Sequence, residues 1–367
     1  MISLAPLPPR TAFLLPLALA AGCSVEEQIH PFTEPITTAP PGTSATVTTG
    51  GSTSTTTAQG TGGSGGSGGS GEVGGSSGSG GAGGSGGAGP TPITKVFLIV
   101  MENRNWSQIK GNPSAPYLNA LLGQGAHAEE YKNPPLLHPS EPNYIWMEAG
   151  SALGVVNNNP PALNHQSTPL HLVNLLEAAG KSWKSYQEDI AGNVCPLWSV
   201  NKYAPKHNPM VFFDDVTEVN NPLAPRCIAH VRPYREIDQD LLTDHVADYS
   251  FLTPNLCHDG HDACAPLFDG IAQGDLWLAG EVPKILSSKA YAEGAVIFIT
   301  WDEGPGGSDG PIGMIALGKK VKVGYENHIP YDHSSLLRSI QTIFGVGPLL
   351  GEAANAVDLG DLFTSFP

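Results

Sequence analysis

Short runs of apolar residues that end abruptly in polar residues recur through the second part of the chain. The clearest is VIFITWDEG at 296–304, where strand-forming residues lead into two adjacent carboxylates and a turn. A short continuous apolar run bounded by turn residues is typical of a strand buried on both faces. The run KVFLIVM at 95–101 has the same form and is followed by a carboxylate and an amide. We expect further strands at 182–187, 249–252 and 311–317.

Between these runs, apolar residues recur at the spacing of amphipathic helices. In the segment 171–180, Leu172, Leu175 and Leu176 fall on one face, and a glycine follows as a C-terminal cap. Strands that alternate with helices predict an α/β fold in which helices cover both faces of a mostly parallel sheet. The other segments expected to contain helices are 114–123, 226–242 (a loop and then a helix), 275–287 and 333–344.

Residues 1–23 have the organisation of an export signal. A positive charge at Arg10 precedes a short apolar segment, and small residues at 20–22 lie directly before Cys23. This junction resembles the bacterial lipoprotein processing site, which predicts that Cys23 is acylated and becomes the mature N-terminus. Cleavage as an ordinary secretory signal is the alternative. The apolar segment is too short to be a permanent membrane-spanning helix.

Residues 24–93 consist largely of Thr, Ser, Gly and Pro and contain repeated GGSGG units. Such a composition cannot bury enough apolar surface to offset the loss of chain entropy, so we expect a disordered linker that acts as a tether. A Gly/Ser coil of about fifty residues has a root-mean-square reach of roughly 40 Å. The remaining residues, 94–367, are numerous enough for one large α/β domain with a substantial core.

The chain is acidic, with a formal net charge of −16 and an isoelectric point of about 5.0. This charge argues against a nucleic-acid-binding surface, which would be basic. A metal site with several carboxylates would contribute to the acidity. A merely soluble, acidic exported protein would explain the charge equally well.

Besides Cys23 the chain has four cysteines, an even number that suggests two disulfides in an exported protein. Four cysteines allow three pairings. We favour Cys257–Cys264, which closes a short loop, together with Cys195–Cys227, which closes a longer one. Zinc ligation by the four thiolates is less well supported because the sequence contains no CxxC motif.

Oxygen and imidazole groups cluster at the predicted strand ends, where open α/β sheets bind their ligands. The carboxylates and amide at 102–103 and 302–303 suit a hard cation, whereas the histidines at 258–261 and 332–333 suit a mixed His/carboxylate site. Two adjacent acids repel each other unless a cation or donors compensate them; a solvated turn is the alternative for 302–303. Phosphoryl transfer needs an activated hydroxyl, cations and hydrogen-bond donors, and this chain offers each.

Six blocks of the sequence form an ordered pattern. They are MENRNW at 101–106, HPSEPNY at 138–144, KHNP at 206–209, TPNLCHDGHD at 253–262, TWDEGPGG at 300–307 and YDHSSLLRSI at 331–340. Together they resemble the bacterial phosphoesterase family, which contains secreted acid phosphatases and phospholipases C and is similar to the alkaline phosphatase superfamily. The resemblance covers residues 94–363 in order. It implies an alkaline phosphatase-like core and makes residues 94–367 the catalytic domain.

The resemblance implies a metal site built from oxygen donors around a serine nucleophile. Ser140 falls where family members keep a Ser or Thr, and its hydroxyl would be deprotonated by metal coordination rather than by a histidine base. Because Ser140 lies between two prolines, a simple turn residue is the alternative. Asn103 and Asn143 would donate hydrogen bonds to the phosphoryl group. The implied metal ligands are Glu102, Asn103, Ser140, Asp302 and Glu303.

The resemblance also assigns roles to several histidines. His138 and His207 would face the substrate as phosphate donors or as the acid that protonates the leaving alcohol; a hydrogen-bonded loop histidine is the alternative for His207. Asp259, His261 and His333 match positions that hold a second metal in the superfamily, or that bind substrate and transfer protons around a single metal. The implied cofactor is a divalent metal ion, and the donors allow Ca, Mg, Mn, Fe or Zn.

The expected activity is hydrolysis of a small phosphomonoester through a phosphoserine intermediate on Ser140, as in acid phosphatases. Phospholipase C members continue into further β-domains, whereas this chain ends soon after 333–344. A phospholipase C-type phosphodiesterase is the nearer alternative, and a non-catalytic surface lipoprotein that serves as a binding module is the more distant one. We expect an exported monomer, secreted or lipid-anchored to the bacterial cell envelope, that touches a membrane only through its anchor and binds no nucleic acid.

Overall fold

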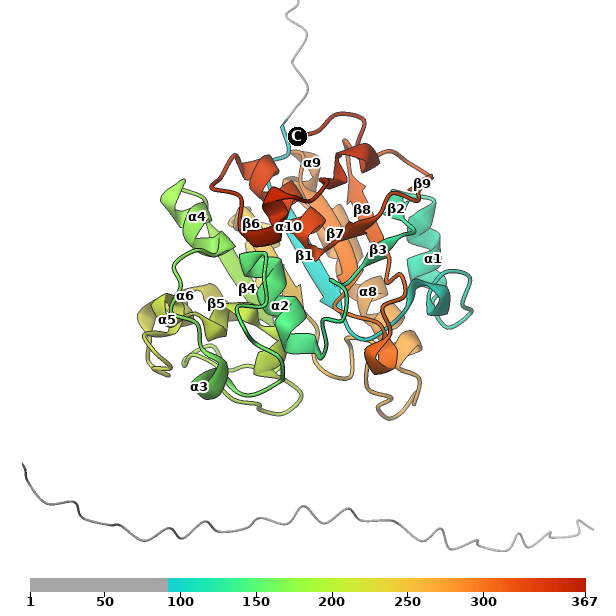
Figure 1. The fold of residues 1–367 in the computed structure, drawn as a ribbon. Coiled ribbons are helices and arrows are strands. Elements are labelled where there is room, and N and C mark those ends of the chain that lie inside the picture. Colours follow the sequence, from blue (N-terminus) through green and yellow to red (C-terminus); the bar gives the residue numbers. More distant parts are fainter. Residues whose placement is uncertain (1–91) are drawn as a thin grey trace, which may run out of the picture. The chain divides into compact units, whose positions relative to one another are not determined.

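A large mixed sheet forms the centre of the computed structural model, which describes residues 92–367. The export segment, Cys23 and residues 24–91 of the expected linker lie outside the described residues. The sheet has eight strands in the order β5-β4-β6-β1-β7-β8-β2-β9 (Figure 1). Neighbours from β5 to β7 are parallel, β8 is antiparallel to β7 and β2, and β2 is parallel to β9. The expected mostly parallel sheet is therefore confirmed.

Most elements outside the centre of the sheet are short. The strands are β1 (Val96–Met101), β2 (Ala126–Ala128), β3 (Tyr131–Lys132), β4 (Trp183–Gln187), β5 (Val231–Pro233), β6 (Tyr249–Thr253), β7 (Val296–Trp301), β8 (Met314–Gly318), β9 (Tyr325–Asn327) and β10 (Tyr331–Asp332). The α-helices are α1 (Pro116–Leu122), α2 (Ser140–Ala149), α3 (Pro161–Asn164), α4 (Leu172–Ala178), α5 (Asp214–Thr217), α6 (Pro225–His230), α7 (Glu236–Thr243), α8 (Gly270–Leu286), α9 (Lys289–Ala292) and α10 (His333–Phe344). Single 3-10 turns lie at Trp106–Gln108, Pro205–His207, Pro209–Phe212, Pro305–Gly307, Gly351–Ala354 and Leu359–Leu362.

The strands β1 and β7 lie side by side in the middle of the sheet, and all of their side chains are buried. A strand that is apolar on both faces needs helices on both sides of the sheet. Accordingly, α2, α4 and α10 contact one another on one face, while α8 contacts α1, α7 and α9 on the other. Figure 1 shows the first group in front of the sheet and α8 behind it.

The predicted strands are found as β1, β4, β6, β7 and β8, and the predicted helices as α1, α4, α7, α8 and α10. Two predicted starts are wrong. The helix α8 begins at Gly270 because the side chain of Asp269 caps it by accepting from Ile271 N and Ala272 N. The strand β8 begins only at Met314, because Gly313 adopts a φ of 78°. The segment 226–242 also contains α6 and β5, where only a loop and one helix were predicted.

Both favoured disulfides are present. Cys195 is bonded to Cys227, with 5.4 Å between the Cα atoms, and Cys257 to Cys264, with 5.6 Å. This pairing excludes a zinc site made of the four thiolates and fits a protein that folds in an oxidising compartment. Among the helices formed by residues 92–367, none combines the length and apolar character needed to cross a bilayer.

Candidate active site

The register of β1 and β7 brings two carboxylates together at the carboxyl edge of the sheet. Met101 pairs with Trp301, so Glu102 and Asp302 leave neighbouring strands at the same level. The loop after β6 joins them, because the Glu102 backbone N–H donates to the Asp259 carbonyl oxygen over 2.8 Å. Both side-chain carboxylates and that of Asp259 are fully buried. The ends of three parallel strands, β1, β6 and β7, thus supply a concentrated acidic site, as the strand-end rule predicts.

Ser140 is the first residue of α2 and points its hydroxyl into this group of acids. Its Oγ donates to Glu102 Oε2 over 3.0 Å, and Asn103 Nδ2 donates to the same carboxylate oxygen at 2.7 Å and to Ser140 Oγ at 3.4 Å. One turn further along α2, Tyr144 donates its hydroxyl to Glu102 Oε1 over 2.7 Å. Ser140 is buried and helical rather than part of a surface turn. The Glu102 carboxylate therefore accepts hydrogen bonds from Ser140, Asn103 and Tyr144.

His207 approaches the same carboxylate from the 3-10 turn Pro205–His207. Its Nε2 lies 3.0 Å from Glu102 Oε1 and its Nδ1 lies 3.7 Å from Asp259 Oδ2. The imidazole stacks on the Tyr144 ring, with 5.2 Å between the centroids and 18° between the planes. Burial lowers the pKa of His207 to about 4, although the charge of Glu102 acts in the opposite direction. His207 thus belongs to the acidic cluster and is not an isolated loop histidine.

His138 and Asn143 are held by protein groups beside Glu303. The Nδ1 of His138 lies 2.5 Å from Glu303 Oε2, and its Nε2 lies 2.9 Å from Asp309 Oδ1. Asn143 Nδ2 donates to Leu137 O over 2.9 Å and to Glu303 Oε2 over 3.3 Å. His138 and Asn143 were predicted to donate to the phosphoryl or leaving group of the substrate. In the structure both side chains contact Glu303 instead.

The residues expected to form a second metal site do not come together. His333 is buried, and its Nε2 lies 2.7 Å from the Asp302 carbonyl oxygen while its Nδ1 lies 3.0 Å from the Tyr131 hydroxyl. With both ring nitrogens occupied, His333 orients the backbone of Asp302 instead of offering a ligand atom. His261 lies at the surface with Nδ1 2.8 Å from Asp262 Oδ1. Of the three, only Asp259 points its side chain into the cluster around Glu102.

The electrostatics of the cluster fit a bound divalent cation. Burial, followed by the charges of Glu102 and Glu303, raises the pKa of Asp302 well above its usual range. Burial and the charge of Glu102 do the same to the pKa of Asp259. Within residues 92–367, the buried Oδ2 atoms of Asp302 and Asp259 have no hydrogen-bond partner. Unpaired buried carboxylate oxygens are costly, and a hard cation with oxygen ligands would satisfy them.

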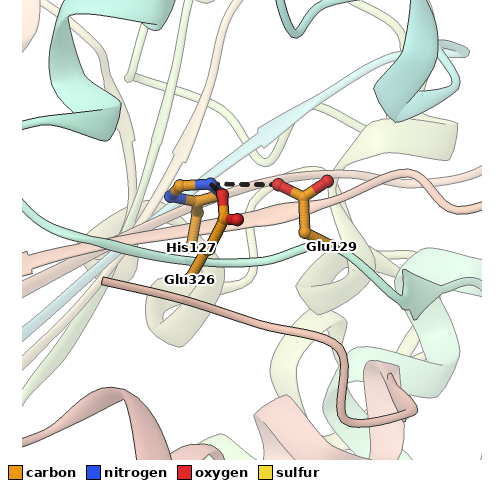
Figure 2. A group of neighbouring side chains, drawn as sticks. All are labelled: His127, Glu129 and Glu326. Atoms are coloured by element: carbon orange, nitrogen blue, oxygen red, sulfur yellow. Dashed lines mark hydrogen bonds and ion pairs between the residues drawn. The ribbon is translucent and has the colours of Figure 1, made fainter. Parts of the chain in front are cut away.

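A second group of potential ligands lies at the β2–β9 edge of the sheet. Figure 2 shows His127, Glu129 and Glu326, whose ligand atoms all lie within 4.8 Å of one another. His127 Nε2 lies 3.0 Å from Glu129 Oε1 and 3.1 Å from Glu326 Oε2. The ammonium of Lys110 already contacts the same two carboxylate oxygens, at 2.6 and 3.0 Å. The sequence does not single out this cluster, because Glu326 lies 199 residues from His127 in the chain.

Three further residues near Ser140 were missed in the sequence. Tyr144 follows Ser140 at helical spacing, so a helix predicted at 140–149 would have placed both side chains on the same face. Asp309 follows the TWDEGPGG block and contacts His138. Lys206 precedes His207 in the KHNP block, and a lysine beside a predicted phosphate site is itself a signal.

Comparisons with known proteins identify the family of the chain. Residues 112–347 match the model of the Phosphoesterase family. The chain is 32% identical to a phosphatidylinositol-3-phosphatase of Mycobacterium tuberculosis, over 73% of this chain and 82% of that protein. It is 28% identical to a probable acid phosphatase of Kluyveromyces lactis, over 67% of this chain but only 57% of the yeast protein.

The fold also matches a solved structure. A protein in the alkaline phosphatase superfamily from Vibrio parahaemolyticus superposes with a TM-score of 0.50 and 11% identity, over 74% of this chain and 72% of that one. This likeness supports the fold alone, since the identity is low. Because the family model covers the greater part of the chain and a relative is 32% identical over 82% of its own length, the chain belongs to the phosphoesterase family and is a hydrolase that acts on phosphoric ester bonds.

Proposed function

We propose that the chain is a metal-dependent phosphomonoesterase of the acid phosphatase type, with a phosphoserine intermediate on Ser140. The observation that carries this proposal is the position of Ser140 Oγ, 3.0 Å from Glu102 Oε2 among buried carboxylates at the carboxyl edge of the sheet. A nucleophile needs an acceptor for its proton and compensation for the charge of the phosphoryl group. The names of the two relatives reported above, both phosphatases, support a monoester substrate.

The residues that would hold the divalent cation are Glu102, Asn103, Ser140, Asp302 and Glu303. The unpaired Oδ2 of Asp302 and the oxygen-rich donor set support this assignment. When bound, the cation would lower the pKa of the Ser140 hydroxyl and offset the negative charge of the phosphoryl group.

The chain's own groups can then be assigned to the steps of hydrolysis. The Ser140 Oγ attacks phosphorus, so that an oxygen–phosphorus bond forms while the bond to the leaving alcohol breaks. The hydroxyl proton leaves to solvent water, while Glu102 Oε2, which accepts a hydrogen bond from Ser140 Oγ, orients the nucleophile. We assign the protonated form of His207 as the acid that donates a proton to the leaving oxygen, because its imidazole lies beside Glu102 and Asp259. With a pKa of about 4 this form is populated in acid solution, which fits an enzyme of the acid phosphatase type. Water then attacks phosphorus and gives a proton to the neutral His207 imidazole, and the bond between phosphorus and Ser140 Oγ breaks. The Oγ takes up a proton from solvent, so that inorganic phosphate leaves and Ser140 is restored.

Export and lipid anchoring through Cys23 remain part of the proposal. The two disulfides support a protein that matures outside the reducing cytosol. Mass spectrometry of the chain expressed in a bacterium would test acylation at Cys23. A mature N-terminus at another residue, without a lipid, would contradict the anchor.

The activity is tested with the purified full chain and p-nitrophenyl phosphate. We expect phosphate release that a chelator abolishes, and a loss of about 10⁴-fold or more in kcat for Ser140→Ala. The matched control is Ser107→Ala, since Ser107 is exposed and outside the acidic cluster. Full, chelator-insensitive activity of Ser140→Ala would overturn the mechanism. Bis(p-nitrophenyl) phosphate tests the phosphodiesterase alternative, and phosphatidylinositol 3-phosphate tests the substrate in the relative's name.

A further inference from the structure

A pocket of about 420 Å³ opens beside the acidic cluster and has no role in the mechanism above. Its walls come from the loop before α3, the loop after Cys195, the turn Pro205–His207 and the loop after β6. The volume lies in the range of small-molecule sites. The lining residues that matter here are Asn158, Pro160, Trp198, Lys206, Leu256 and His261.

Three of these residues connect the pocket directly to the cluster around Ser140. Asn158 Oδ1 accepts a hydrogen bond of 2.9 Å from the backbone N–H of Glu141, the residue after the nucleophile. Lys206 is the chain neighbour of His207, which contacts Glu102. The backbone N–H of His261 donates to Asp259 Oδ1 over 2.9 Å. These contacts place the pocket next to the cluster around Ser140.

Lys206 is a half-buried cation with no ion-pair partner in the part of the chain that the structure describes. A lysine can bury its aliphatic stem and keep its ammonium in water, where the charge can meet an anionic ligand. The pKa of Glu102 falls because, against the effect of burial, the charges of His207 and Lys206 stabilise its carboxylate. The ammonium thus lies within electrostatic reach of the acidic cluster and is free to contact a phosphoryl oxygen.

Trp198 presents an aromatic surface to the same pocket. Its side chain is 52% exposed, although a tryptophan usually buries most of its area. Its loop is fixed by the Cys195–Cys227 disulfide and by the Tyr203 hydroxyl, which donates to the Pro196 carbonyl oxygen over 2.9 Å. Trp198 also lines a neighbouring hollow of about 320 Å³. An exposed aromatic ring on a tethered loop beside a pocket is typical of a surface on which a planar ligand group stacks.

We propose that this pocket is the leaving-group subsite of the enzyme, and that it accepts a phosphomonoester whose alcohol carries a planar ring. Trp198, with Pro160 and Leu256, provides the apolar wall for the ring, and Lys206 contacts the phosphoryl group. This inference rests on the proposed function, since it takes Ser140 as the point of attack.

Binding of two unreactive phosphonates tests the subsite without any need for turnover. The full, cation-loaded chain is titrated by calorimetry with phenylphosphonate and with methylphosphonate. We expect phenylphosphonate to bind about tenfold more tightly, which is the size of a good aromatic contact. Trp198→Ala should remove this preference and leave methylphosphonate binding unchanged, whereas Lys206→Met should weaken both ligands about tenfold.

Matched controls keep the test specific. Lys202→Met removes an exposed lysine of the same segment, and Leu242→Ala removes an exposed apolar side chain distant from the pocket in sequence; neither should change either affinity. Equal affinities of the two phosphonates for the unaltered chain, no binding of either, or the same loss in Lys206→Met as in Lys202→Met would overturn the subsite. The proposed function fails by a different result, retention of full, chelator-insensitive turnover by Ser140→Ala.

Discussion

The backbone N–H of Asn103 donates to Asp302 Oδ1 over 2.9 Å, so the residue after Glu102 fixes the first carboxylate after β7. Asn103 adopts a φ of 49°, a left-handed conformation that asparagine tolerates better than most residues other than glycine. In this conformation the backbone N–H of Asn103 points toward Asp302, while its side-chain amide donates to Glu102 and Ser140. One residue thereby positions the acid, the nucleophile and the shared acceptor.

Replacing Asn103 separates its backbone role from its side-chain role. Asn103→Gly keeps the left-handed conformation but removes the donors to Glu102 Oε2 and Ser140 Oγ, so we expect kcat to fall by about 10² or more with little loss of stability. Asn103→Ala loses the same donors and also places a Cβ at positive φ. It should cost about 1 kcal/mol more in the free energy of unfolding. Activity assays and urea titrations of both variants distinguish the two effects; equal stabilities would contradict the backbone role.

Asp302→Asn should weaken cation binding while relieving repulsion in the metal-free chain. Burial and the charges of Glu102 and Glu303 raise the pKa of Asp302, which means that its ionised form is unfavourable without a cation. We expect the variant to lose activity and bound metal, and to have a melting temperature in chelator at least equal to that of the unaltered chain. Elemental analysis measures the bound metal, and thermal unfolding in chelator measures the melting temperature. A variant that keeps stoichiometric metal would show that Asp302 is not a ligand.

Glu148 should make the protein less stable as the pH rises. Its carboxyl is fully buried in α2, and burial raises its pKa to about 8 from an unfolded value of 4.5. The Val173 backbone N–H, which donates to Glu148 Oε2, and the nearby Tyr249 hydroxyl act in the opposite direction. A group with a raised folded pKa contributes stability that is complete below about pH 4.5 and is lost as the pH rises toward 8. Glu148→Gln retains the neutral shape and removes this loss.

The measurement is the free energy of unfolding of the chain and of Glu148→Gln between pH 4.5 and 8.5. We expect the free energy of unfolding of the variant to increase relative to that of the unaltered chain as the pH rises, by a few kcal/mol at most. Glu141, whose pKa burial also raises to about 8, contributes the same slope to both proteins and cancels in the comparison. Parallel curves for the two proteins would contradict the assignment to Glu148.

The centre of the fold was predictable because its pattern is local. The buried runs of β1 and β7 are continuous in the sequence, and the rule that ligands bind at the carboxyl ends of parallel strands places Glu102 and Asp302 together. The helix α2 was not predicted, because Pro139 and Pro142 resemble turn residues. Pro139 is the N-cap residue and Pro142 lies in the first turn, where a missing N–H costs nothing.

The roles of the histidines were not predictable, because they depend on contacts between distant segments. His333 contacts Tyr131, 202 residues away in the sequence, and the Asp302 carbonyl, 31 residues away. No pattern in the sequence indicates that both ring nitrogens of His333 are within hydrogen-bond distance of other protein groups. The same holds for His138, which is held between Glu303 and Asp309. Residue type identified the chemistry of the site, whereas only the tertiary structure separates potential ligands from the residues that hold them.

The cluster of His127, Glu129 and Glu326 in Figure 2 should bind a metal only when Lys110 is removed. The Lys110 ammonium contacts Glu129 Oε1 and Glu326 Oε2, the oxygens that a metal would need, and thereby compensates their charge. Lys110→Ala frees these atoms beside His127 Nε2, a donor set that suits zinc. We therefore expect the zinc content of Lys110→Ala, saturated and then dialysed, to exceed that of the unaltered chain by one equivalent.

A second substitution locates the additional zinc. Adding His127→Gln to Lys110→Ala should remove the extra equivalent, because the imidazole is the nitrogen ligand of this cluster. Phosphatase activity should be the same in all three proteins, since none of these residues belongs to the cluster around Ser140. If the unaltered chain already binds the extra zinc, the ammonium does not exclude metal. The charge balance inferred for this edge of the sheet would then be wrong.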